Sequence, residues 1–266
     1  MSDQETAEEI NTALEDPVPS MGDAPITTVE LIRGLYDADQ DVWHTDAEVR
    51  ELNGEDEEYL ASIESKKDLI YAEYITHVLS RAVTRIGSVT LTPKTAPTAV
   101  SKLIMGDRDT LFLGIVKATY GDTRDIQMMC GSCGASNDVE LDLDEDFPMQ
   151  KPSFDVKKGL KVETSKGTIS LRLPNSEDIV MGQKETKTDA EFNTYVLSRC
   201  AVWTKNKAPS NPLEWARKLN IGDRKKLVNA LLDIEIGPKM GEVNTQCASC
   251  GEDMPILLDW VSLLFS

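Results

Sequence analysis

Histidine, aromatic side chains and long apolar runs are all scarce in this chain of 266 residues. The chain has two histidines, His44 and His77, and aromatic residues make up 6% of it. No apolar run approaches the roughly 20 residues that a membrane-spanning helix needs. Residues 1–14 are acidic and polar, so we expect neither a signal peptide nor a transmembrane helix. We therefore expect a globular protein of a reducing cytoplasm, or of an assembly built there.

Positive charge is also in short supply. The chain has 28 Lys and Arg against 46 Asp and Glu, which gives a formal net charge of −18. A surface of that sign repels the phosphate backbone of DNA or RNA. We therefore expect no nucleic-acid partner, and no membrane partner either.

Patterns typical of catalytic sites are missing as well. The sequence shows no nucleophile with its base, no glycine-rich phosphate-binding loop and no paired-carboxylate site. We interpret His44 and His77 as surface or packing residues. The sequence thus predicts a protein that is not an enzyme.

What the chain does contain is one cysteine motif in two copies. The pattern Cys-x-x-Cys-Gly occurs at 130–134 and again at 247–251. Each such knuckle turns both of its sulfurs toward one ion, and the trailing glycine permits the positive φ of the turn. The sequence therefore predicts one tetrahedral structural zinc ion per chain, bound by Cys130, Cys133, Cys247 and Cys250.

Other uses of these four thiols stay open at this point. A Cys-x-x-Cys pair also serves redox chemistry, and both pairs can stand as reduced thiols or disulfides in turns. An iron–sulfur centre is a further alternative, although ferredoxin-type cysteines cluster more tightly in sequence. The fifth cysteine, Cys200, is interpreted as a small buried hydrophobe.

Local patterns predict an outline of the secondary structure. Residues 1–25 are acidic and poor in apolar side chains, which favours a flexible arm. Thr28 is expected to cap a short helical turn, and Asn53 to cap a longer helix. A further helix is expected over 69–87, ending at Gly87, and a hairpin over 160–173. Strands are expected on both sides of each knuckle.

Longer segments than the knuckles also match between the two parts of the chain, in the same order. The matching pairs are 50–56 with 172–178, 72–81 with 190–199, and 102–108 with 218–224. Their offsets of 122, 118 and 116 residues drift by only six. We infer an internal duplication, in which each unit comprises a strand, a helix, a second helix opened by Gly-Asp-Arg, and a knuckle.

The predicted fold class is therefore α+β, with two duplicated halves at 26–147 and 148–266. If each half supplies one knuckle, a single ion completes its four ligands only where the halves meet, around a pseudo-two-fold axis. Zinc would join the halves in a zinc-ribbon-like site, and its binding free energy would support folding. Asp107 and Asp223, from the two Gly-Asp-Arg copies, are expected to cap the helices that follow them.

Four features then stand in a characteristic order. They are the acidic helix start at 52–57, the apolar helix from Asp107 to the Thr-Tyr-Gly at 119–121, the two knuckles, and the final Leu263-Leu264-Phe265. This order, over 45–266, resembles the tail and baseplate proteins of contractile-tailed bacteriophages, the group related to the T4 baseplate hub and hub-assembly protein.

The resemblance implies a non-enzymatic structural component of the virion, in the hub or wedge region of the tail baseplate. It also implies assembly in the host cytoplasm, several copies, and contacts with hub, wedge or tube proteins. The apolar run at 260–265 is either a docking element or the last core element of the second half. The alternatives are a tail-assembly chaperone that is absent from the mature virion, and a cytoplasmic Cys-x-x-Cys redox or adaptor protein.

Overall fold

The computed structural model describes residues 26–64, 70–203, 208–239, 242–257 and 263–264. The acidic arm predicted over residues 1–25 lies outside the described residues. Within them, helices and strands alternate in a mixed fold with several small sheets, as an α+β class requires. None of the described helices combines the length and the apolarity that crossing a bilayer takes.

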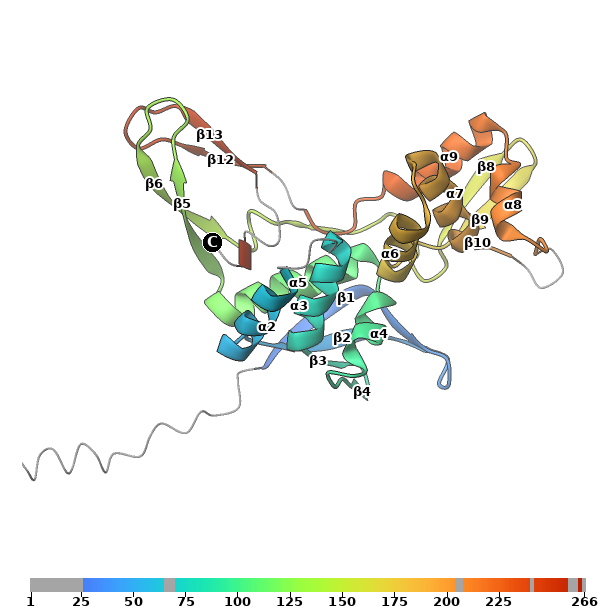
Figure 1. Ribbon diagram of the computed structural model, residues 1–266, viewed down its shortest axis with the longest axis horizontal. Coiled ribbons are helices and arrows are strands. Elements are labelled where there is room, and N and C mark those ends of the chain that lie inside the picture. The colour runs from blue at the N-terminus through green and yellow to red at the C-terminus, as the bar shows by residue number, and fades with distance from the viewer. Residues whose placement is uncertain (1–25, 65–69, 204–207, 240–241, 258–262, 265–266) are drawn as a thin grey trace, which may run out of the picture.

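The elements fall into three parts (Figure 1). The first body contains β1 (Ile26–Asp37), β2 (Val42–Arg50), α2 (Gly54–Glu64), α3 (Tyr71–Ala82), β3 (Val83–Ile86), β4 (Val89–Thr90), α4 (Ala96–Ser101) and α5 (Met105–Tyr120). The second body contains β8 (Leu160–Thr164), β9 (Gly167–Leu171), α6 (Ser176–Glu185), α7 (Asp189–Cys200), β10 (Ala201–Val202), α8 (Pro212–Arg217) and α9 (Ile221–Leu232). The third part, the ribbon arm, consists of the hairpins β5 (Thr123–Met129) with β6 (Ser136–Asp142) and β12 (Glu242–Gln246) with β13 (Asp253–Leu257).

The first body is an antiparallel sheet, in the order β1-β2-β3-β4, covered by helices. Apolar residues alternate along β1 and β2, so that Val29 and Val49 turn inward and are buried. Helix α5 packs on this face, and a Cβ at Gly114 would lie 2.5 Å from Val29 Cγ2. The helix therefore approaches the strand more closely than any larger residue at 114 would allow. Each buried Val, Leu or Ile here contributes about 1.5–3 kcal/mol to stability.

The second body repeats this plan at a smaller scale. Its sheet has the order β10-β9-β8, and its core joins Leu171 of β9 to Leu197 of α7 and Leu227 of α9. The predicted hairpin over 160–173 is thus confirmed as β8 and β9. Two linking segments connect this body to the ribbon arm, and they pair through the short strands β7 (Met149–Gln150) and β11 (Gly237–Pro238).

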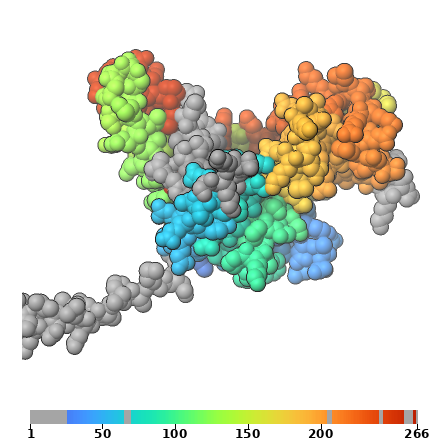
Figure 2. Space-filling model, in the orientation of Figure 1, coloured from blue at the N-terminus to red at the C-terminus, as the bar shows by residue number. Residues whose placement is uncertain are grey.

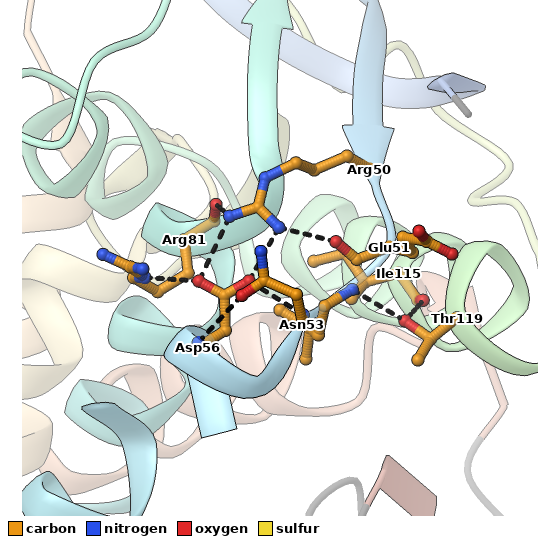
Figure 3. Close-up of polar contacts among 8 residues, drawn as sticks. Arg50, Glu51, Asn53, Asp56, Arg81, Ile115 and Thr119 are labelled. Atoms are coloured by element: carbon orange, nitrogen blue, oxygen red, sulfur yellow. Dashed lines mark hydrogen bonds and ion pairs between the residues drawn. The ribbon is translucent and has the colours of Figure 1, made fainter. Parts of the chain in front are cut away.

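One buried ion cluster occurs in each body. In the first body, the carboxylate of Asp56 forms ion pairs with Arg50 Nη1 and Arg81 Nε, each at 2.6 Å (Figure 3). In the second body, the carboxylate of Asp178 forms ion pairs with Arg172 Nη1 at 2.6 Å and with Arg199 Nε at 3.1 Å. In each case the asparagine three residues before the aspartate, Asn53 or Asn175, exchanges hydrogen bonds with it at the helix start. The predicted capping role of Asn53 is confirmed.

The arginine of each Gly-Asp-Arg motif also makes matching contacts in the two bodies. Arg108 donates to the carbonyl oxygens of Ala72, at 2.8 Å, and Val100, at 3.3 Å. Arg224 donates to the carbonyl oxygens of Ala190 and of Ala216, the latter at 3.5 Å. Both arginines thereby tie the start of their own helix to the two helices that precede it.

The aspartates of these motifs do not cap helices, contrary to the prediction. Asp107 accepts backbone N–H groups from residues 32–34 of β1, the shortest at 2.6 Å from Ile32. Asp223 accepts the Ser165 N–H at 2.8 Å, in the turn between β8 and β9, and Asn220 provides the cap of α9. The two carboxylates instead accept hydrogen bonds from strand and turn N–H groups that have no partner in a sheet. A sequence pattern confined to the helix does not reveal these distant donors.

Two boundary predictions were also wrong. The helical turn expected after Thr28 is a strand, because β1 pairs with β2 along 26–30 and again at 35–37. The helix expected to stop at Gly87 ends at Ala82, and Gly87 lies in the turn between β3 and β4 with φ +57°. The strand propensity of Val83 and the neighbouring Thr84 overrode the helical pattern there.

The ribbon arm projects from the first body, away from the second body (Figure 1). In the space-filling view the arm and the second body stand apart as two separate projections (Figure 2). Of the C-terminal run at 260–265, the structure describes Leu263 and Leu264, which are fully buried in the core of the first body. Tyr120 Oη donates to the Leu264 carbonyl at 2.6 Å. These two residues are therefore core residues; Trp260 and Phe265 lie outside the described residues.

Candidate metal centre

The two knuckles adopt the same backbone turn at the tip of the ribbon arm. Gly134 and Gly251 have φ values of +73° and +72° and donate to the carbonyls of Cys130 and Cys247 at 2.9 and 2.8 Å. The N–H groups of Cys130 and Cys247 in turn each donate at 2.9 Å across the base of the turn. Glycine is needed at both positions because the turn requires a left-handed residue. The trailing glycine predicted from sequence thus has its expected role.

The four sulfurs converge on one point. Cys130 Sγ lies 3.7 Å from Cys250 Sγ, and Cys133 Sγ lies 3.6 Å from Cys247 Sγ. All four sulfur atoms lie within 4.8 Å of one another. Sulfurs bound at about 2.3 Å to one tetrahedral ion are about 3.8 Å apart, whereas a disulfide brings two sulfurs to about 2.05 Å. The donor set therefore fits a thiophilic tetrahedral ion and not a pair of disulfides.

The environment of the knuckles shifts the pKa values of two of the sulfurs in opposite directions. Cys130 and Cys247 are buried, while Cys133 and Cys250 are exposed. Backbone N–H groups of Cys250 and Ser249 point at the Cys247 sulfur and lower its pKa to about 6. At Cys250 the Glu252 N–H acts in the same direction, but hydrogen bonds with the neighbouring cysteine sulfurs and burial outweigh it and raise the pKa to about 12. A deprotonated sulfur is the form that binds metal, so the turn favours that form at Cys247 and not at Cys250.

A polar residue outside the knuckles joins the two hairpins. Asn137, on the inward face of β6, accepts the Ala248 N–H at 2.9 Å. Its amide nitrogen donates to the Ala135 carbonyl at 3.0 Å and contacts Met254 Sδ at 3.6 Å. Sequence reasoning missed Asn137, although one signal was present: a polar residue stands where the alternation of β6 calls for an apolar one.

The remaining candidate residues lie away from the sulfurs. Cys200 is fully buried in the second body, where burial raises the pKa of its thiol to about 12. His44 Nε2 lies 3.7 Å from Asp37 Oδ2, and His77 Nδ1 lies 2.8 Å from Tyr59 Oη. These are local packing contacts, as expected for both histidines. Among the described residues, the four knuckle cysteines are the one group of His, Cys, Asp or Glu side chains placed to hold a metal ion.

Comparison with known proteins gives one match. A family model described as "T4 bacteriophage base plate protein" matches residues 36–264. The matched region includes the first body from the end of β1 onward, the second body, and both hairpins of the ribbon arm with all four converging cysteines. Neither the curated proteins nor the solved structures compared with the chain give a match. The chain belongs to the family of T4 bacteriophage base plate proteins.

Proposed function

We propose that this chain is a non-enzymatic structural component of the hub or wedge region of a phage tail baseplate, and that it acts in virion assembly. It works there through contacts with other baseplate or tail proteins, in several copies, and without nucleic-acid or membrane partners. Membership of a baseplate family supports this role and places the protein in the tail of the virion. The assembly site we propose is the host cytoplasm.

The observation that carries the proposal is the convergence of two knuckles that lie more than a hundred residues apart in sequence. We propose that Cys130, Cys133, Cys247 and Cys250 bind one zinc ion per chain as thiolates. Four thiolates fill a tetrahedral shell, so the ion has no open position for a substrate and its role is structural. Its binding free energy, about 10–16 kcal/mol in zinc-finger peptides, then adds to the stability of the folded chain.

We further propose that residues 26–147 and 148–266 arose by duplication and that the zinc site lies on a pseudo-two-fold axis between them. The matching ion clusters around Asp56 and Asp178 support this proposal. So do the matching contacts of Arg108 and Arg224. Matching sets of polar partners in both bodies are hard to obtain from unrelated segments, because each polar group needs its own partners.

The two halves differ in where their knuckle hairpins pack. The second knuckle hairpin contacts the first hairpin, and Ile256 and Leu264 belong to the core of the first body. The second half thus supplies one body of its own and one hairpin to its neighbour. Zinc then fixes the exchanged hairpin in place.

Two other functions remain as alternatives. A tail-assembly chaperone shares the family and the acidity but leaves the particle. A cytoplasmic redox or adaptor protein uses the Cys-x-x-Cys pairs as thiols. The sulfur positions weigh against separate redox pairs, because sulfurs of different knuckles approach to 3.7 and 3.6 Å and all four lie within 4.8 Å of one another.

The test is metal content per chain, measured on protein purified without added metal, together with the thermal midpoint before and after a strong chelator. We expect one zinc per chain and a lower midpoint after chelation. Metal-free protein with four reactive or oxidised thiols would return the redox alternative to first place. Purified tail particles are then probed for the chain: its presence supports the structural role, and its absence from particles whose assembly requires it identifies a chaperone.

A further inference from the structure

Strand β1 has a sheet partner on one side only. The sheet of the first body has the order β1-β2-β3-β4, so β1 is an edge strand. Its backbone N–H groups at 32–34 are nevertheless satisfied, because they donate to the buried carboxylate of Asp107. Over 26–30, β1 pairs with β2, and no described strand lies on its other side. The chain thus closes one part of this edge and leaves the other part open.

The open part presents the backbone groups of Thr28 and Glu30. The Asp46 carbonyl accepts the Gly87 N–H at 2.8 Å, so Asp46 turns its backbone groups toward the β3 side and away from β1. Residues directly opposite each other in an antiparallel pair turn their backbone groups either both inward or both outward. Glu30 lies opposite Asp46, so its N–H and C=O point away from β2, and those of Thr28 point the same way. Within the described chain these four groups have no hydrogen-bond partner.

A groove of about 780 Å³ runs along this open edge. Its walls are β1 at 27–32, helix α5, and the linking segment at 144–157. Several apolar side chains line the groove, among them Leu113, Phe147, Met149 and Phe154. Met149 is 43% exposed, so part of this apolar lining is open to solvent. The volume lies within the roughly 300–1,000 Å³ that is typical of binding pockets.

The open edge and the groove together match an extended polypeptide. The backbone groups of Thr28 and Glu30 recur at about 7 Å, which is the spacing at which an added strand presents its own N–H and C=O groups. A residue of that strand opposite Val29 shares the face of Val29, which packs against α5 and also lines the groove. Its side chain therefore enters the groove, and the apolar lining favours an aliphatic or aromatic one.

The chain's own segments are poor candidates for this strand. Residues 1–25 contain seven Asp or Glu, three Pro and no Lys or Arg. Acidic residues and proline are unfavourable in strands, and the exposed Glu30 repels further negative charge at this edge. Pairing with β1 of a second copy would bring a second Glu30 to the same edge. The chemistry of the edge therefore favours a strand from a different protein.

We propose that an extended segment of another baseplate protein pairs with the open edge of β1, at Thr28 and Glu30, and inserts an apolar side chain into the groove beside α5. This inference rests on the proposed function and names the kind of partner segment. The main-chain hydrogen bonds provide affinity, and the groove provides specificity for the inserted side chain. The added strand also covers a sheet edge that is a site of aggregation in a free chain.

The experiment compares Thr28→Pro with Thr90→Pro, which each remove one outward N–H, from opposite edges of the same sheet. Thr90 lies in the other edge strand, β4. The Leu91 N–H donates to the Thr84 carbonyl at 2.8 Å, so the groups of Thr90, one residue earlier, point to the free edge. Proline is tolerated in an edge strand where the lost N–H faced solvent, so both variants are expected to fold.

Phage is grown with each variant as the sole source of the protein, and the chain is quantified in purified tail particles. Metal content and thermal midpoint are first shown to match those of the wild type. We expect Thr28→Pro to lower incorporation at least about tenfold, the equivalent of about 1.4 kcal/mol, and Thr90→Pro to leave it unchanged.

A second pair of variants tests the groove without changing the strand. Met149→Glu places a carboxylate in the apolar groove, whereas Met181→Glu places one on α6 of the second body, where the methionine is 38% exposed. We expect Met149→Glu to lower incorporation as Thr28→Pro does, and Met181→Glu to leave it unchanged. Equal incorporation within both pairs would overturn strand addition and leave the baseplate role intact. Absence of the wild-type chain from the particles would instead count against the baseplate role.

Hydrogen exchange on the isolated full chain gives an independent test of the open edge. The N–H groups of Thr28 and Glu30 should exchange rapidly, and that of Val29, which faces β2, should exchange slowly. Slow exchange at Thr28 and Glu30 would mean that the isolated chain already covers this edge. Protection that rises with protein concentration would assign the edge to a second copy, and constant protection would assign it to the chain's own residues; either result overturns the proposal.

Discussion

The side-chain oxygen of Asn137 accepts the backbone N–H of Ala248 at 2.9 Å, and this bond joins the hairpin of one knuckle to the turn of the other. The two residues are 111 positions apart in sequence. Asn137 occupies the third position after Gly134, and Met254, which it also contacts, occupies the third position after Gly251. The contact between Asn137 and Met254 thus links corresponding positions of the two hairpins.

Substitution of Asn137 by alanine should destabilise the protein by about 1–3 kcal/mol, because buried polar groups lose their partners. Gln127→Ala is the control: it removes an exposed bond on the opposite face of the same hairpin and should cost less than about 0.5 kcal/mol. Denaturant unfolding of both variants measures the difference. After chelation the effect of Asn137→Ala should shrink, and an undiminished effect would mean that the hairpins stay together without metal.

Asp56→Asn should destabilise the first body strongly, by roughly 3–5 kcal/mol, since it leaves two arginines without their buried partner. Asp178→Asn should cost less. The arginines around Asp178 are 34% and 48% exposed, against 24% and 27% around Asp56, so water compensates more of the loss. Chemical denaturation ranks the two variants. Equal losses would show that exposure of the arginines does not control the energy of these clusters.

The same two clusters predict how the stability of the protein falls at acid pH. Burial raises the pKa of Asp56 and of Asp178, but hydrogen bonds from the arginines and from backbone N–H groups outweigh it and hold both pKa values below the ordinary 3.8. A folded-state pKa below the unfolded value gives stability that is present above about pH 4 and lost as pH falls through the folded value. Thermal midpoints measured from pH 7 to pH 2 should fall most steeply below pH 4. Asp56→Asn should flatten that fall.

Cys200 should be inert in the folded protein, because burial raises its pKa to about 12 and leaves the thiol uncharged at pH 8. With a chromogenic thiol reagent, chelated but folded protein should release four equivalents, and the fifth should react only in denaturant. Cys200→Ser should keep one metal ion per chain, whereas Cys130→Ser should lose it. Five rapidly reacting thiols in the folded, chelated protein would contradict the burial of Cys200.

The two Gly-Asp-Arg glycines should respond differently to alanine. A Cβ at Gly106 would lie 2.4 Å from the Ile236 carbonyl oxygen, while a Cβ at Gly222 meets only Asn220 Oδ1 at 3.4 Å. Gly106→Ala should therefore cost about 1–3 kcal/mol through overpacking. Gly222→Ala should be neutral, or stabilising by up to about 1 kcal/mol, because alanine favours helix. Thermal unfolding of the pair tests this, and a similar loss in both would point to a shared backbone requirement.

Features that depend on a short stretch of sequence were predictable. The knuckle turns, the strands beside them and the cap at Asn53 follow from residue types at fixed spacing, and all are present. The convergence of Cys130 and Cys250 was also predictable, because two half-sites in one chain suggest one ion. Metal identity and the duplication stay predictions.

Features that depend on distant partners were not predictable. Asp107 is a residue type that often caps a helix, and it stands at the start of one. Its carboxylate oxygens nevertheless accept hydrogen bonds from a strand more than 70 residues earlier in the chain. The strand at Thr28 was not predictable either. The apolar residues around it follow no clear period, and only the pairing with β2 defines them as a strand. Asn137 likewise has a visible role only once the second hairpin lies against the first.

The separation of the knuckles sets an order of events in synthesis. Cys133 and Cys247, 114 residues apart, meet only after the whole second body has been translated between them. The first hairpin therefore waits with two unpartnered cysteines while the rest of the chain is made, and closing so long a loop is slow. A ribosome that stalls before residue 247 thus releases a chain that cannot hold the ion. Under the proposed zinc site, only a chain that has been translated past both hairpins supplies all four sulfurs.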